Sequence, residues 1–154
     1  MKEAKIYFFY LFVLTLSEVN SQSIITYKYN DLEFGDVFIG YSTTILHTDE
    51  NAAQFYFYHT KFYKSDLLVT FKLPRFLSNG KNSIPIKFSN NCGSWSFNNR
   101  QIGRTIFNPA SPLEIRSALF YLPIYLWLGG SISTNSGMSP GIYSGSISLT
   151  IEFL

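Results

Sequence analysis

Two histidines and one cysteine are the side chains of this sequence best suited to nucleophilic or acid–base chemistry. A thiol and an imidazole act as nucleophile and base when they lie within hydrogen-bonding distance of each other. His47, His59 and Cys92 could supply such a pair, but the residues around the cysteine, 90–94, match no nucleophile motif. We expect both histidines to be structural or solvated residues near strand ends, and Cys92 to be a small core residue. An intermolecular disulfide or a reactive thiol is the alternative for Cys92.

Carboxylates offer a second route to catalysis, because a glycosidase uses two of them facing across a cleft. Asp31, Glu33 and Asp36 cluster, but in a turn-rich stretch where acidic side chains usually face solvent. The sequence contains no metal-ligand spacing and no P-loop, dinucleotide-binding or G-x-S-x-G motif. We therefore predict no catalytic, metal-binding or cofactor-binding residues, and we expect a protein that is not an enzyme.

Aromatic side chains are the more promising binding residues. Five of them lie opposite the aliphatic row of their predicted strands: Tyr56, Tyr58, Tyr121, Tyr125 and Trp127. Exposed aromatic rings on a sheet can stack on sugars or anchor a protein partner. The alternative is that the sheet is covered on both faces, or that the tyrosines simply pair across strands. We take Tyr56, Tyr58, Tyr125 and Trp127 as the candidate ligand or partner contacts.

Alternation of apolar and polar residues is the main structural pattern after residue 22. At the C-terminus, Ile147, Leu149, Ile151 and Phe153 alternate with polar residues, which is typical of a strand with one buried face. Similar patterns predict further strands at 24–29, 36–38, 43–46, 53–58, 67–72, 84–88, 94–97 and 121–128. Because Pro123 lacks an amide donor, the strand that contains it should lie at a sheet edge or begin there.

Turn-forming residues separate these strands at short intervals. Pro140 and Gly141 fit the central pair of a type II turn, in which the glycine has a positive φ. Only residues 111–119 resemble a helix, since Ser111-Pro112 followed by Glu114 suits a first helical turn. Many short strands with frequent turns are typical of a sandwich or barrel. We predict one all-β, antiparallel domain over residues 22–154, most simply a β-sandwich.

The first 21 residues are typical of an export signal. Lys2 and Lys5 form a short basic region, and residues 6–16 are an almost unbroken apolar run. Val19 and Ser21 supply the residues that signal peptidase prefers, which predicts cleavage before Gln22. The alternative is an uncleaved anchor, but a membrane span needs about 20 apolar residues and this run is shorter. We therefore expect an extracytoplasmic protein with no stable membrane span after cleavage.

The overall charge argues against a nucleic-acid partner. The formal net charge of the 154 residues is only +2, and the basic residues are scattered. Aromatic residues make up 18% of the chain and charged residues 14%, the opposite of the balance in a disordered tail. A folded domain with a substantial core is expected.

Several short motifs resemble, in order and spacing, the bacterial family called domain of unknown function 4402. Residues 126–133 contain a Gly-Gly strand, and 139–151 contain P-G-x-Y-S-G followed by a final alternating strand. Residues 32–35 are similar to the family's opening L-x-F-G element, while 52–55 and 73–74 are similar to its A-x-F strand and following L-P. The resemblance spans most of residues 30–154. It implies a secreted, immunoglobulin-like β-sandwich, with fimbrial and adhesin sandwiches as a wider group, and it carries over no functional residues.

Two functions fit these observations. The first is a secreted or surface structural or interaction module, fimbria-like or adhesin-like, with other protein subunits as partners; it would act in the periplasm, on the outer surface or in the medium. In that case 23–29 could be a strand donated to a neighbour, although we favour it as the first strand of its own domain. The second is a carbohydrate-binding module that contacts cell-surface glycans through Tyr125 and Trp127.

Overall fold

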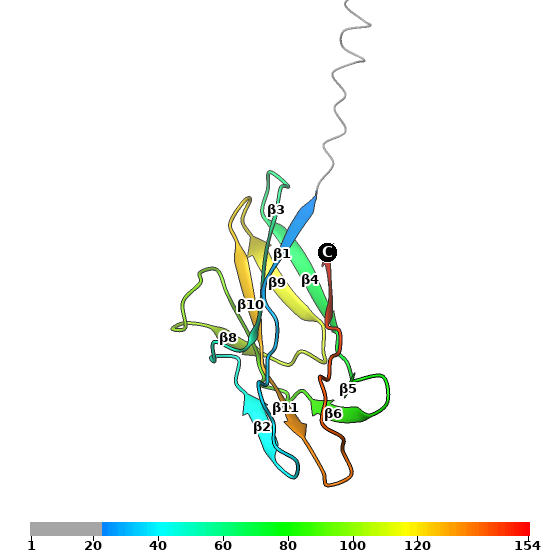
Figure 1. Cartoon of the computed structure of the whole chain (residues 1–154). Helices are drawn as coiled ribbons and strands as arrows, with labels where there is room; N and C mark the ends of the chain where they lie inside the picture. The colour runs from blue at the N-terminus through cyan, green and yellow to red at the C-terminus, as the bar shows by residue number, and fades with distance from the viewer. Residues whose placement is uncertain (1–22) are drawn as a thin grey trace, which may run out of the picture.

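The computed structural model describes residues 23–154, and every regular element in that range is a β-strand. The prediction of an all-β, antiparallel fold is therefore confirmed. The predicted signal peptide, residues 1–21, and its cleavage before Gln22 lie outside the described residues. Figure 1 shows the strands of a five-stranded and a three-stranded sheet in one half of the molecule and those of a four-stranded sheet in the other.

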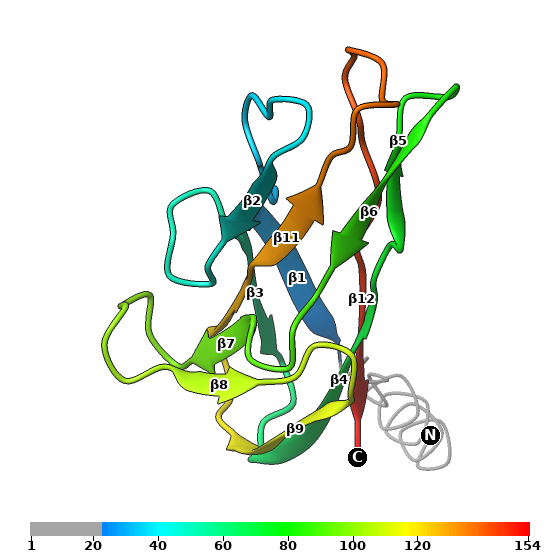
Figure 2. The same cartoon turned by 90° about the horizontal axis from the view of Figure 1, so that it is seen from below.

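Each sheet is antiparallel throughout. The five-stranded sheet has the order β1 (Ile24–Asn30), β3 (Ala53–His59), β10 (Ile124–Leu128), β7 (Gly93–Ser96), β8 (Thr105–Phe107). The three-stranded sheet has the order β12 (Ser148–Phe153), β4 (Ser65–Lys72), β9 (Leu113–Ala118). The four-stranded sheet has the order β2 (Ser42–Ile45), β11 (Gly130–Ser133), β6 (Ser83–Lys87), β5 (Phe76–Ser78), and its strands lie side by side in Figure 2.

The main core lies between the five-stranded and the three-stranded sheets, which pack face to face as in a β-sandwich. Along β4, buried and exposed residues alternate, and Leu67 and Val69 have no accessible surface. They pack in one cluster with Phe57 of β3 and Leu126 of β10. The final strand shows the same periodicity, because the inward side chains of β12 are half-buried and its outward side chains are exposed. The alternation of apolar and polar residues thus gives each of the two sheets one apolar face, and these faces pack against each other.

The four-stranded sheet continues the five-stranded one through a bend at Gly129. β10 and β11 are separated by this single buried residue. A Cβ atom on Gly129 would collide with the backbone carbonyl of Ile45 and lie 2.9 Å from the amide nitrogen of His47. Because only glycine permits this approach, the long strand can turn here without losing its neighbours. Gly129 is therefore a bend between two consecutive strands, β10 and β11.

Residues 111–119 contain a strand and no helix, so the prediction of a helix there is wrong. Leu113–Ala118 is β9, and its residues pair with β4. Ile115 and Ala118 are fully buried in the main core. The apolar residues Leu113 and Ile115 also fit period two, and pairing with β4 outweighs the local resemblance to a first helical turn.

Two further predictions, for residues 36–38 and for Pro140-Gly141, are wrong. The structure also decides between the two positions predicted for the strand at Pro123. Residues 36–38 form no strand. Gly141 is not among the residues with positive φ, so Pro140-Gly141 does not form a type II turn. The strand that follows Pro123 begins at Ile124 but lies centrally, between β3 and β7. Proline is tolerated because it stands just before the strand, outside the hydrogen-bonded ladder.

Candidate functional site

A row of tyrosines covers the outer face of the five-stranded sheet, the face turned away from the main core. We call Tyr27, Tyr56, Tyr58, Tyr121 and Tyr125 the tyrosine row. Neighbouring ring centroids lie 4.7 Å apart for Tyr27 and Tyr56, 5.6 Å for Tyr56 and Tyr125, and 5.4 Å for Tyr58 and Tyr121. Each contact joins rings from different strands or from a strand and a loop. The row thus ties β1, β3 and β10 together from outside.

Strand register explains why these side chains meet. Tyr27 of β1 pairs directly with Tyr56 of β3, which pairs in turn with Tyr125 of β10. Directly opposed side chains on one face of an antiparallel sheet have Cβ atoms about 5 Å apart, within reach of stacking. The inward residues of the same strands, such as Phe57 and Leu126, are fully buried. Alternation therefore sends the aliphatic side chains inward and the tyrosines outward.

The tyrosine row is only partly open to solvent. Tyr56, Tyr58 and Tyr125 are half-buried, while Tyr27 is 42% and Tyr121 56% exposed. The pKa of Tyr58 is raised above its usual value, first by its contact with the hydroxyl of Tyr27 and then by partial burial. Since the rings of Tyr27 and Tyr56 are stacked at 11°, part of each ring face is already covered by its neighbour. These two stacked rings therefore present edges and hydroxyl groups to solvent more than free ring faces.

Trp127 does not lie open on this face, so the expectation that it is exposed is wrong. Its side chain is 3% exposed, because the guanidinium of Arg104 lies 3.4 Å from the centroid of its ring. Arg104 is held there by hydrogen bonds that it donates to the backbone carbonyls of His47, at 2.8 Å, and Arg100, at 2.9 Å. The segment between β7 and β8 thus folds back over the end of the row. A cation over an aromatic ring is stabilising, so the contact with Arg104 gives Trp127 a role in the stability of the fold.

Of the four candidate contacts chosen from the sequence, the structure brings Tyr56, Tyr58 and Tyr125 together and buries Trp127. Two members of the row were missed as candidates. Tyr27 lay in a predicted strand of its own, and nothing local showed that this strand is the neighbour of β3. The sequence pattern predicts that Tyr121 faces outward, although it is not among the four candidates; it lies in the loop before β10, and its amide donates to the carbonyl of His59 at 3.1 Å. Alternation can mark both as outward residues, but it does not show that they lie beside Tyr56 and Tyr58.

The groove on the other half of the molecule is a second candidate site. It has a volume of about 1150 Å³ and lies between residues 31–39, residues 138–147 and the strands of the four-stranded sheet. Its floor includes Ile84, Ile86 and Ile132, which form a second buried cluster. Partly buried side chains such as Phe34 and Met138 pack on that cluster from the irregular segments. The groove walls therefore serve to cover a small core.

The histidines and the cysteine occupy separate environments. His59 is fully buried and its Nε2 lies 3.0 Å from the carbonyl oxygen of Ala118. Burial, and then the charge of Arg104, lower the pKa of His47, whereas burial raises the pKa of the Cys92 thiol. Among residues 23–154, no hydrogen bond joins either histidine to Cys92, and no cluster of three potential metal ligands occurs. The arrangement of Cys92 agrees with a buried core residue.

The comparisons with known proteins give no match: no family model matches the chain, and no curated protein matches its sequence. The resemblance to the domain of unknown function 4402 family therefore stays a prediction. Within the described part of the chain, no helix is long and apolar enough to cross a membrane.

Proposed function

We propose that the chain is an extracytoplasmic, immunoglobulin-like interaction module of the domain of unknown function 4402 type. Its work is to associate with protein subunits, in a fimbria-like or adhesin-like role. The observation that carries the proposal is the tyrosine row on the outer face of β1, β3 and β10. Tyrosine is favoured at protein interfaces because it buries a large ring and keeps a hydroxyl for hydrogen bonding.

A second copy of the chain is the partner that we propose for this face. Tyr27 of the edge strand β1 is 42% exposed, and Tyr29, which lies at the register shift between β1 and β3, is 63% exposed. Two such faces packed together would cover both rows in a symmetric contact. Addition of a strand to the free edge of β1 is less favourable, because Lys28 of that strand carries a charge, paired with Asp31 at 2.9 Å. Charged residues on an edge strand oppose edge-to-edge pairing.

The pairing of β1 with β3 bears on donor-strand exchange. Within the described chain, residues 24–30 pair with β3 of the same molecule over six partner positions. This supports the reading of 23–29 as the first strand of its own sandwich. Association through the tyrosine row needs no exchange of that strand.

A carbohydrate-binding module is the alternative. Sugar stacking needs a free aromatic face, and the stacked pair in the row offers mainly edges, with Trp127 covered by Arg104. The geometry therefore favours a protein partner. Tyr121 is the member of the row with the largest exposed surface, and a glycan that bound here would depend on it.

Sedimentation equilibrium over a range of protein concentrations tests the proposal. We expect association that Tyr27→Ser weakens about tenfold, because one well-packed tyrosine at an interface can contribute more than 1 kcal/mol. Tyr41→Ser is the matched control, since Tyr41 is 68% exposed but lies outside the row. A monomer at all concentrations would contradict the proposal, and binding to a glycan array that Tyr121→Ser abolishes would favour the alternative.

A further inference from the structure

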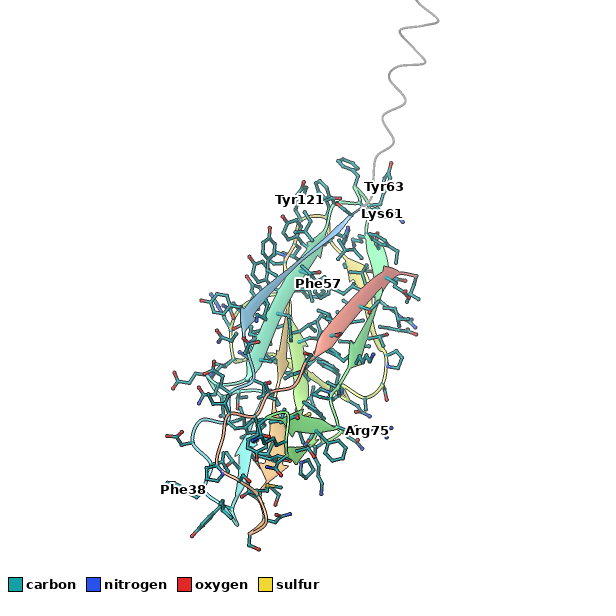
Figure 3. The ribbon with its side chains drawn as sticks, turned by 45° about the vertical axis from the view of Figure 1, so that its right-hand side comes forward. Phe38, Phe57, Lys61, Tyr63, Arg75 and Tyr121 are labelled. Carbon is teal, nitrogen blue, oxygen red and sulfur yellow. The ribbon has the colours of Figure 1, made fainter. Side chains whose placement is uncertain are left out.

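Four aromatic side chains gather at one end of the sandwich, where the tyrosine row ends at Tyr121. We call Phe62, Tyr63, Phe120 and Tyr121 the aromatic tip. They come from two loops, residues 60–64 between β3 and β4 and residues 119–123 between β9 and β10. Phe62 is 75% and Tyr63 73% exposed, so most of each ring faces solvent. Figure 3 shows Tyr63 and Tyr121 at this end and Phe38 at the opposite end.

The two loops hold each other in place. The rings of Phe62 and Phe120 have centroids 5.5 Å apart, and those of Phe120 and Tyr121 are 4.4 Å apart in an edge-to-face contact. Tyr121 has a φ of 54°, in the left-handed region that bulky residues rarely adopt. Its amide hydrogen bond to His59 maintains that conformation. The tip is thus a preorganised apolar surface rather than a set of unrelated side chains.

The charged residues of the two tip loops are both lysines. Lys61 and Lys64 belong to the first loop, and neither loop contains a carboxylate. The Nζ of Lys61 lies 5.2 Å from the centroid of the Phe153 ring, a cation–π contact at the edge of the tip. Asp66, the carboxylate that follows in the sequence, accepts a hydrogen bond from the amide of Ser117 at 2.7 Å. The tip therefore combines exposed rings with two lysines.

We propose that the aromatic tip binds a lipid surface with anionic headgroups. Tyrosine and phenylalanine rings partition to the boundary between headgroups and acyl chains, and lysines beside them reach the headgroup phosphates. Interfacial binding of this kind grows with the buried apolar area and with the attraction to anionic lipid.

The position at which the chain enters the sandwich also supports a lipid surface as the ligand of the tip. The amide of Ser23 donates to the Thr60 hydroxyl at 3.2 Å, and the Thr60 amide donates to the Ser23 carbonyl at 3.0 Å. The chain therefore enters the sandwich beside the first loop of the tip. Only residues 17–22 separate Ser23 from the apolar run 6–16, a distance of at most about 25 Å when extended. While that run is in a membrane, the tip is the end of the sandwich held nearest to the lipid.

Tryptophan fluorescence of the full chain on vesicles tests this proposal. Phe62→Trp places a probe in the tip, and Phe38→Trp, at a position 76% exposed at the other end, is the matched control. On vesicles of phosphatidylcholine and phosphatidylglycerol, we expect the emission of the Phe62→Trp protein to shift to shorter wavelength. Brominated lipid should quench that probe but not the control probe. Because an inserted apolar run would itself hold the tip near the lipid, both probes are also compared in residues 22–154, the predicted mature chain, where a difference between them must come from the tip.

Two results would overturn the proposal: no change for Phe62→Trp when vesicles are added, or equal quenching of the two probes. Charge reversal supplies an independent readout. Lys61→Glu with Lys64→Glu, introduced into the Phe62→Trp protein, should weaken quenching on vesicles that contain phosphatidylglycerol and leave it little changed on phosphatidylcholine alone. Equal quenching with and without the reversal would contradict the requirement for anionic headgroups. Self-association through the tyrosine row is measured without lipid, so the two proposals can fail separately.

Discussion

The ring of Tyr27 on the edge strand β1 stacks on the ring of Tyr56 on β3, with centroids 4.7 Å apart and ring planes at 11°. β1 contributes little to the main core, since four of its seven residues are exposed. Besides its backbone hydrogen bonds, β1 is therefore held in the sheet mainly by side-chain contacts on the outer face. The same contact joins β1 to the proposed binding face, of which it forms one edge.

Removal of this ring should destabilise the fold moderately. We expect Tyr27→Ala to lower the free energy of unfolding by about 1 kcal/mol, from the lost stacking and the partial burial of the ring. Urea denaturation followed by circular dichroism measures the change. Tyr29→Ala is the control, because Tyr29 is on the same strand and has no aromatic contact among the described rings. An equal loss from both substitutions would contradict a specific role for the stack.

The cover on Trp127 should depend on the shape of Arg104 as well as on its charge. Arg104→Lys keeps the charge but cannot donate to the His47 and Arg100 carbonyls while lying flat on the ring. We expect a loss of about 1–2 kcal/mol in stability and a shift of tryptophan emission to longer wavelength as water reaches the indole. Arg100→Lys is the control, because Arg100 contributes its carbonyl to this contact. Unchanged emission in Arg104→Lys would show that other groups keep Trp127 covered.

The bend at Gly129 should be intolerant of any side chain. In Gly129→Ala the new methyl group would meet backbone atoms of Ile45 and His47, which cannot rotate away. We expect a loss of about 2 kcal/mol or more, as for overpacking in a rigid core. Gly137→Ala is the matched control; its nearest neighbour would be the Asn135 side-chain oxygen at 3.6 Å, an ordinary contact. Thermal denaturation of both variants distinguishes the two sites, and equal melting temperatures would refute the close approach.

Acid should destabilise the protein through His47. Burial, and then the charge of Arg104, lower its pKa in the folded state below the ordinary 6.5. The unfolded chain then binds a proton more readily than the folded one, so stability is present above about pH 6.5 and is lost as the pH falls through the lowered folded-state pKa. We expect His47→Gln to lose less stability than the wild type between about pH 7.5 and about pH 5. Parallel pH profiles for the two proteins would rule out this contribution.

Much of the strand structure could be predicted from the sequence because alternation is a local property. Leu67, Val69 and Phe71 alternate with more exposed residues in the pattern that the structure confirms for β4. β9 was mistaken for a helix because six residues are too few to separate the two periodicities once Pro112 and Glu114 suggest a helical start. Short strands such as β8 offer too few residues for any period to be recognised.

The candidate site was predicted in part, for a related reason. Outward tyrosines on β3 and β10 follow from alternation, which is why Tyr56, Tyr58 and Tyr125 were chosen. Tyr27 lies beside these tyrosines because β1 is the neighbour of β3 in the sheet. Trp127 is excluded from the exposed surface because Arg104, from the loop between β7 and β8, lies over its ring. Both are long-range facts that no local pattern carries.

Footprinting of tyrosine side chains tests the proposed binding face most directly. Hydroxyl radicals modify exposed rings, and mass spectrometry reads the extent at each tyrosine as the protein concentration is raised. The account predicts that Tyr27 becomes protected at concentrations where the protein self-associates, while Tyr41, which is more exposed and lies outside the row, is modified equally throughout. Protection of Tyr41 with no change at Tyr27, or no protection of either in the associated protein, would contradict the assignment of this face.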